Sequence, residues 1–147
     1  MDNKNFTTTI IVDQSPSVVF NAINNPRSWW TEDIEGDSEK LNDIFIHRYK
    51  DIHITKLKVV ELTPDEKVVW LVLENYFSFT KDKSEWINTN VIFEISKKDE
   101  KTQLKFTHEG LVPAYECYDK CENAWTNFVQ NSLKALIETG KGKPTVI

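Results

Sequence analysis

The spacing of the apolar residues along this chain changes once, and that change limits the possible folds more than any other feature. Up to His108 the β-branched and aromatic residues recur at every second position, which is typical of strands with one buried face. From Ala114 onward they recur at every third or fourth position, which is typical of an amphipathic helix. The sequence therefore predicts a run of strands and then one long helix. The helical stripe comprises Ala114, Tyr118, Cys121, Trp125, Phe128, Val129, Ser132 and Leu136.

The N-terminal part adds one strand and two short helices. The β-branched run from Phe6 to Asp13 predicts the first strand. Ser15 then supplies a hydroxyl that caps a helix of about two turns, and Pro16 suits its first position. A second short helix is predicted from Arg27 to Thr31, where it carries a pair of adjacent tryptophans.

Further runs rich in β-branched and aromatic residues are candidate strands. They are Leu41 to Tyr49, Ile52 to Leu62, Lys67 to Tyr76, Trp86 to Ser96 and Thr102 to His108. The charged segment from Lys97 to Lys101 predicts a hairpin turn, so we expect sequential antiparallel pairing. The register of the strand within 37–51 stays open. The long connection from Phe77 to Glu85 is a candidate mobile flap.

The C-terminal helix is predicted from Tyr115 to Thr139, and Gly140 supplies its stop. At about 1.5 Å per residue this helix is about 37 Å long, which is too long for packing against a small flat sheet. A curved sheet must therefore wrap around it. The order of strand, two short helices, strands and long helix predicts an α+β fold, and we expect residues 1–147 to form a single domain.

Charge and cysteine content narrow the possible partners and location. The chain has 18 Lys and Arg against 23 Asp and Glu, a formal charge of −5, so nucleic acid is not an expected partner. Cys117 and Cys121 lie four positions apart in the predicted helix, which favours reduced thiols over a disulfide. The sequence shows neither a secretory leader nor an apolar stretch that could span a membrane, so we expect a soluble cytoplasmic protein.

Three groups of residues make the chain similar to a known superfamily. They are Ser15-Pro16-x-x-Val19-Phe20 with Asn25-Pro26 and Trp29-Trp30, then Thr102-x-Leu104-x-Phe106-x-His108-x-Gly110, and Ala124-Trp125-x-x-Phe128 with Leu133 and Leu136. Over nearly its whole length the chain resembles the START-like or SRPBCC superfamily. The most similar branch is that of the C-terminal domain of the activator of heat-shock protein 90 ATPase. Ala124 departs from that branch, which commonly has Gly at this position, and its methyl group narrows the space between helix and sheet.

This resemblance implies a helix-grip fold in which a curved antiparallel sheet and the C-terminal helix enclose a cavity. The implied function is binding of a small hydrophobic or amphipathic ligand. A cyclase- or hydrolase-type enzyme using the same cavity and a co-chaperone for heat-shock protein 90 are the alternatives. A monomer or a homodimer is expected, with no cofactor. The residues expected to line the cavity are Trp30, Trp70, Phe93, Leu104, Phe106, His108, Tyr118, Cys121, Trp125 and Phe128.

The sequence leaves some roles of the tryptophan and histidine side chains open and disfavours metal binding and catalysis. The tryptophans either line a pocket or fill the core, and His108 either is structural, contacts a ligand or acts as a base. His47 and His53 flank a predicted hairpin and are expected to be exposed. Cys117, Cys121 and His108 lack a CxxC motif or a fourth ligand, so we predict no metal site. The sequence contains no serine-hydrolase, P-loop or zincin motif, and no catalytic constellation is predicted.

Overall fold

The computed structural model describes residues 5–50, 52–78, 86–111 and 118–144. The strands are β1 (Phe6–Val12), β2 (Ile34–Gly36), β3 (Ile44–Tyr49), β4 (His53–Thr63), β5 (Lys67–Phe77), β6 (Asn90–Lys98) and β7 (Lys101–Glu109). The helices are α1 (Pro16–Ile23), the 3-10 helix η1 (Pro26–Ser28), α2 (Tyr118–Asn127), the π-helical segment η2 (Phe128–Leu133) and α3 (Lys134–Thr139).

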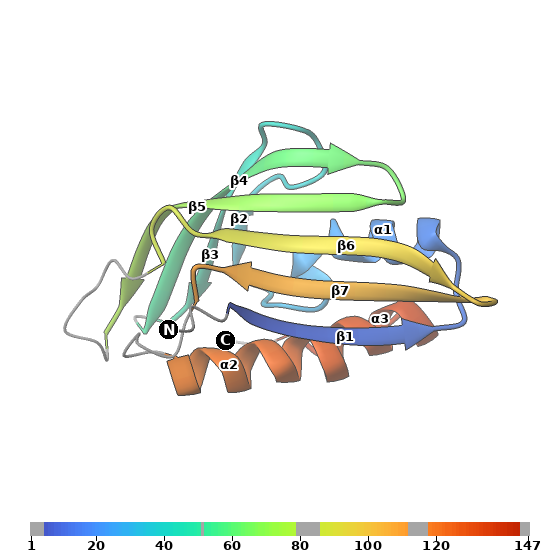
Figure 1. The fold of residues 1–147 in the computed structure, drawn as a ribbon. Helices are drawn as coiled ribbons and strands as arrows, with labels where there is room; N and C mark the ends of the chain where they lie inside the picture. Colours follow the sequence, from blue (N-terminus) through green and yellow to red (C-terminus); the bar gives the residue numbers. More distant parts are fainter. Residues whose placement is uncertain (1–4, 51, 79–85, 112–117, 145–147) are drawn as a thin grey trace.

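The strands form one curved antiparallel sheet, and the C-terminal helical segments run along it (Figure 1). The strand order is β1-β7-β6-β5-β4-β3-β2, so neighbours in the chain are neighbours in the sheet from β2 to β7. The first strand pairs with the last, with Phe6 opposite His108 and Val12 opposite Thr102. This arrangement confirms the predicted α+β helix-grip fold. Among the described residues, no helix has the length and apolarity needed to cross a membrane.

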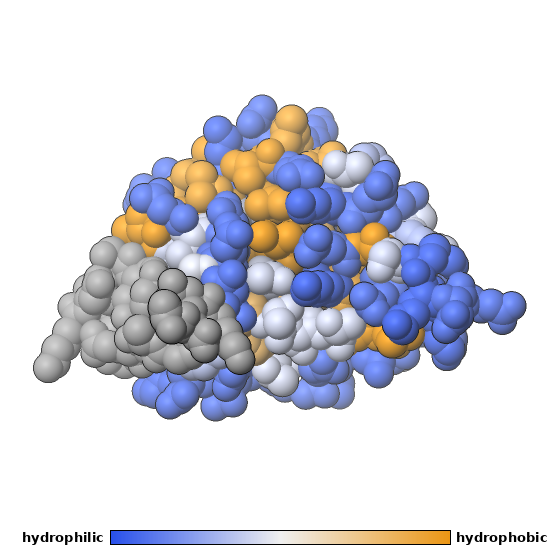
Figure 2. Space-filling model, in the orientation of Figure 1, coloured by the Kyte–Doolittle hydropathy of each residue, from blue (hydrophilic) through white to orange (hydrophobic). Residues whose placement is uncertain are grey.

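The inward faces of the strands carry the predicted period of two. In β7 the buried side chains are those of Thr102, Leu104, Phe106 and His108, and their neighbours are more exposed. Glu109 therefore lies on the face opposite His108, as the alternation predicts. Figure 2 shows hydrophilic side chains interrupted by hydrophobic ones on the side of the molecule in view. The alternation thus places one set of side chains in the core and leaves the other on the surface.

Two of the predicted strands begin later than the sequence indicates. The strand predicted from Leu41 begins at Ile44, because Asn42 has a positive φ of 73° and belongs to a turn. The strand predicted from Trp86 begins at Asn90, and a turn again precedes it. The other predicted strands agree with the structure to within one residue at each end, while β2 was not predicted.

The second short helix also differs from its prediction. It is a 3-10 helix at Pro26–Ser28 and not a helix from Arg27 to Thr31. Trp29 has a φ of −134°, outside the helical range, and therefore ends it. The backbone leaves the helix at this residue, and both Trp29 and Trp30 are buried in the core. The candidate flap lies largely within 79–85 and the first turn of the predicted long helix within 112–117, outside the described residues.

The long C-terminal helix contains a π-helical stretch at its centre. Of the predicted stripe, Cys121, Trp125, Val129 and Ser132 are buried and Tyr118, Phe128 and Leu136 are half-buried, while Ala114 lies outside the described residues. Leu133 and Ile137 were not predicted but are buried, so the buried row recurs at every fourth residue, at Cys121, Trp125, Val129, Leu133 and Ile137. A hydroxyl within the π turn, that of Ser132, donates to the carbonyl oxygen of Trp29 at 2.6 Å. The middle of the helix is therefore tied to the segment that carries the two adjacent tryptophans.

Candidate functional site

A pocket of about 260 Å³ lies between the sheet and the start of α2. Figure 1 shows the β3–β4 hairpin and the beginning of α2 at the same end of the molecule. Aromatic rings make up most of the wall, and its described residues include no carboxylate. The lining residues are Trp30, His47, Tyr49, Ile52, His53, Phe77, Trp86, Lys120, Cys121, Ala124, Trp125 and Phe128.

One wall of the pocket is a stack of rings from three parts of the chain. The rings of Trp30 and His47 lie nearly parallel, with centroids 4.0 Å apart and planes inclined by 15°. Trp30 also meets Trp125 of α2 at 4.9 Å. His47 meets His53 edge to face at 4.8 Å across the β3–β4 hairpin. Flat apolar surfaces therefore cover this side of the pocket.

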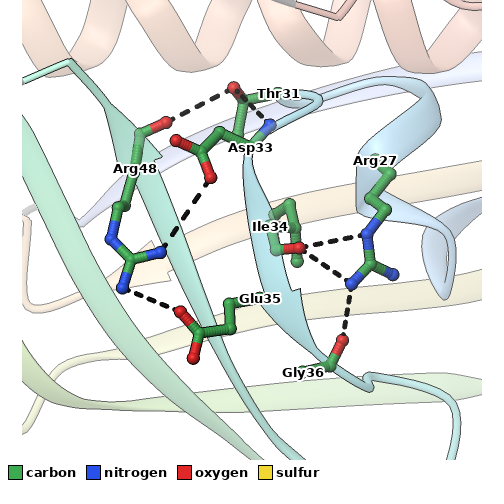
Figure 3. A network of polar contacts seen from close by, with 7 residues as sticks. All are labelled: Arg27, Thr31, Asp33, Ile34, Glu35, Gly36 and Arg48. Atoms are coloured by element: carbon green, nitrogen blue, oxygen red, sulfur yellow. Dashed lines mark hydrogen bonds and ion pairs between the residues drawn. The ribbon is translucent and has the colours of Figure 1, made fainter.

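The segment that carries Trp29 and Trp30 is held by polar contacts to the edge strand β2 (Figure 3). The guanidinium of Arg27 donates to the carbonyl oxygen of Ile34 at 2.8 Å and to that of Gly36 at 2.7 Å. These bonds tie β2 back to η1, just before the tryptophan pair. A guanidinium presents several donors in a fixed plane, which suits it to clamp two backbone oxygens at once.

A second wall of the pocket contains Trp86 and Trp125. A chain of three hydrogen bonds through His108, which does not itself line the pocket, holds this wall in place. The indole Nε1–H of Trp125 donates to Nδ1 of His108 at 3.0 Å. Because Nδ1 accepts, the proton of the neutral imidazole sits on Nε2, which donates to Thr89 Oγ1 at 2.8 Å. The hydroxyl of Thr89 in turn donates to the carbonyl oxygen of Trp86 at 2.5 Å. We call Trp125, His108, Thr89 and Trp86 together the His108 relay. The relay links α2, β7 and the turn before β6.

The relay requires a neutral histidine. Burial lowers the pKa of His108 to about 3, so the imidazole is uncharged near neutral pH. A protonated ring would carry hydrogen on both nitrogens and lose the bond from Trp125. Both nitrogens are already bonded, and neither partner is a carboxylate. The geometry therefore favours the structural role of His108 over the role of a base.

The relay holds two tryptophan rings of the pocket against each other. Trp86 and Trp125 are stacked, with centroids 5.7 Å apart and planes inclined by 11°. Trp86 also stands edge-on to His53 at 4.7 Å and to Phe77 at 5.3 Å. The second wall is therefore built from α2, β4, β5 and the turn before β6.

Among the described residues that line the pocket, two fully buried polar atoms have no hydrogen-bond partner. They are Nδ1 of His47 and Nε1 of Trp86, and each side chain is only 3% exposed. His53 differs, because its Nε2 lies 3.0 Å from Asn75 Oδ1. Burial lowers the pKa of His53 to about 3, and burial also lowers that of His47 well below its usual range. Both imidazoles are therefore neutral at the pocket wall.

The structure divides the residues expected to line the cavity into two groups. Trp30, Cys121, Trp125 and Phe128 lie at the pocket. The others do not line it: Trp70, Phe93, Leu104 and Phe106 are fully buried in the core, His108 stands behind the wall, and Tyr118 is half-buried at the start of α2.

Sequence reasoning missed the histidines of the β3–β4 hairpin. The expectation that His47 and His53 are exposed is wrong, because His47 is 3% exposed and His53 is half-buried. A signal was present, since Phe45, His47 and Tyr49 alternate and place the imidazole on the same face as a core phenylalanine. The other pocket residues not foreseen are Tyr49, Ile52, Phe77, Trp86, Lys120 and Ala124.

Of the disfavoured zinc set of Cys117, Cys121 and His108, two members belong to the described residues. Cys117 lies outside the described residues, while Cys121 is buried. Within the described ranges, no group of three or more His, Cys, Asp and Glu side chains is arranged to hold a metal ion.

The fold and the position of the long helix place this chain in the structural class of START-like, or SRPBCC, proteins. The solution structure of the Aha1 dimer from Colwellia psychrerythraea matches 95% of this chain and 99% of its own, with TM-score 0.75 and 25% identity. A protein from Staphylococcus saprophyticus matches 97% of this chain and 98% of its own, with TM-score 0.68 and 12% identity. These similarities confirm the resemblance to START-like proteins and to their Aha1-like branch.

The same fold occurs in a protein from the dynemicin biosynthetic locus, DynU16. It matches 97% of this chain but only 49% of its own length, with TM-score 0.68 and 16% identity. A scan of protein-family models and a search of curated proteins find no match.

Proposed function

We propose that this protein binds a small apolar or amphipathic molecule in the pocket between the sheet and α2. The observation that carries the proposal is the composition of the wall, in which three tryptophans and two phenylalanines surround a space of about 260 Å³. Ligand pockets are typically apolar clefts of about 300 to 1,000 Å³ with a few polar groups, so this one suits a small ligand. Removal of the ligand's apolar surface from water would provide most of the affinity.

We further propose that residues 1–147 act as one domain in the cytoplasm, as a monomer or a homodimer. The spacing of Cys117 and Cys121, four positions apart in the sequence, favours reduced thiols over a disulfide and so supports a reducing compartment. The dimeric state of the similar Aha1 protein supports the homodimer.

The pocket proposal is tested by filling the pocket. Ala124 lies at the pocket on an exposed position of α2, so the Ala124→Trp variant should fold while its indole occupies the space. We expect a fluorescent apolar dye to bind the unaltered protein saturably and to lose at least about tenfold in affinity in the variant. The matched control is Thr126→Trp, which adds the same ring two residues away at an exposed position outside the pocket.

Comparison of the two variants distinguishes binding in the pocket from nonspecific binding of the dye elsewhere on the protein. Loss of binding in Ala124→Trp together with retention in Thr126→Trp supports the proposal. Equal dye affinity in both variants would place the dye elsewhere and contradict it. Circular dichroism confirms that each variant is folded before the titration is interpreted.

A co-chaperone role is the second candidate, and the match to the Aha1 protein favours it. That match extends over almost the full length of both chains at 25% identity. We would titrate the protein into heat-shock protein 90 and measure both binding and ATPase rate. A saturable rise in the ATPase rate supports this role, and the absence of binding would remove it.

A further inference from the structure

From the pocket proposed above, we infer that the ligand is a flat, uncharged aromatic molecule of about two rings that carries a hydroxyl or carbonyl oxygen. The inference depends on that pocket being a binding site, and it adds the shape, the charge and the polar group of the occupant. Each of these three properties follows from a separate feature of the wall.

The expected shape of the ligand follows from the aromatic rings of the pocket wall. Trp30 and His47 form one stacked pair, while Trp86 and Trp125 form another, inclined by 15° and 11° respectively. Ring faces and edges interact best with other rings in offset-stacked or edge-to-face arrangements. A volume of about 260 Å³ lies just below the usual range of ligand pockets, about 300 to 1,000 Å³, and suits a ligand of about two rings. A flexible alkyl chain of the same size offers no flat face or ring edge and does not match this geometry.

Charge follows from the ionisable groups at the wall. His47 and His53 are neutral because burial lowers the pKa of each. The described lining residues include no Asp or Glu, so no carboxylate there would pair with a bound cation. Lys120 carries the charge at this wall, but it is exposed and lies between Asp119 and the nearby Glu122 on the helix. A charged group deep in the pocket would lose its hydration without a buried counter-charge.

The polar group follows from the two unpartnered atoms. Nε1–H of Trp86 can only donate, so it requires an acceptor, and an oxygen supplies one. Nδ1 of His47 also has no partner, and a ligand hydroxyl could donate to it in the tautomer that leaves this nitrogen unprotonated. Both side chains line the pocket, so rotation of either ring could turn its nitrogen toward the ligand. A buried polar atom without a partner carries a desolvation penalty that a ligand oxygen would remove.

The test compares four probes of similar size by isothermal titration. They are 2-naphthol, naphthalene, 2-naphthoate and 1-decanol. We expect 2-naphthol to bind about five- to tenfold tighter than naphthalene, as one hydrogen bond would provide. We expect 2-naphthoate and 1-decanol to bind more weakly than 2-naphthol, because the first is charged and the second is flexible.

Two variants examine the assigned donor. Trp86→Phe keeps an aromatic ring and removes the N–H, so the preference for 2-naphthol over naphthalene should disappear. The matched control is Trp70→Phe, because Trp70 also has a buried unpartnered Nε1 but does not line the pocket. In this control the preference should remain. Urea unfolding checks that both variants are folded under the titration conditions.

The outcomes distinguish this inference from the proposal on which it rests. Tighter binding of 1-decanol or 2-naphthoate than of 2-naphthol would overturn the ligand class while leaving the pocket a binding site. Retention of the full preference in Trp86→Phe would overturn the assigned hydrogen bond. If none of the probes binds and the dye is not displaced, both the ligand class and the pocket proposal fail.

Discussion

Acidification from about pH 7.5 to about pH 5.5 should destabilise the fold through its histidines. Burial lowers the pKa of His53 and His108 to about 3, and burial lowers that of His47 as well, from an ordinary value of 6.5. Below pH 6.5 the unfolded chain therefore binds more protons than the folded chain. The stabilisation is complete above pH 6.5 and is lost as the pH falls toward 3.

The size of the effect follows from these pKa values. At about pH 5.5, a histidine with an unfolded pKa of 6.5 that stays neutral when folded costs roughly 1 to 2 kcal/mol of stability. His53 and His108 together therefore remove about 3 kcal/mol, and His47 adds to the loss in the same direction. This is a large part of the roughly 5 to 15 kcal/mol that stabilises a typical domain.

Urea unfolding followed by tryptophan fluorescence at about pH 7.5, 6.5 and 5.5 measures the effect. The His108→Phe variant should be less stable throughout, because Trp125 loses its acceptor, but its loss on acidification should be smaller by roughly 1 to 2 kcal/mol. The reasoning is refuted if the unaltered protein keeps its free energy of unfolding within about 0.5 kcal/mol over this range. It is also refuted if the variant shows the same pH dependence.

Three further changes examine the packing behind the pocket, each by urea unfolding at neutral pH. Thr89→Val leaves Nε2–H of His108 without an acceptor and should cost about 1 to 3 kcal/mol, whereas Thr89→Ser keeps the hydroxyl; equal losses would contradict the relay. Phe93→Ala opens a cavity in the core and should cost about 3 to 5 kcal/mol, and a loss below about 1 kcal/mol would show that this ring is not packed as described. Ser132→Ala removes the bond to the carbonyl oxygen of Trp29 and should cost about 1 to 3 kcal/mol; an unchanged stability would mean that this tie is unimportant.

The fold was predictable because its main signals are local. Alternation in runs such as Thr102 to His108 shows which face of a strand is buried, and the helical stripe shows which side of the C-terminal helix meets the sheet. The cap at Ser15 is also a local signal, and its hydroxyl accepts from the backbone of Val18 at 3.4 Å. Errors occurred where a backbone turn interrupts an apolar run, as at Asn42.

The candidate site was less predictable because residues distant in sequence build it. Trp30, Trp86 and Trp125 meet at the pocket only after the sheet has curved, and no local pattern distinguishes them from core tryptophans such as Trp70. The relay through His108 depends on which atoms face each other across α2 and β7. Spacing along a strand tells which face a histidine occupies, but it does not identify the partner of each ring nitrogen.

The π-helical stretch at Phe128–Leu133 has a consequence for how this chain can change in length. A regular α-helix turns by about 100° per residue, so a buried row at every fourth position would swing by about 160° between Cys121 and Ile137. The wider turn winds more slowly and keeps the row directed at the sheet. Deleting one residue there would return the stretch to ordinary winding, and the rotation lost with the residue would be regained from the tighter turn, so Ile137 would still face the sheet. The centre of this helix is therefore a place where the chain can lose one residue without turning its buried row away from the sheet.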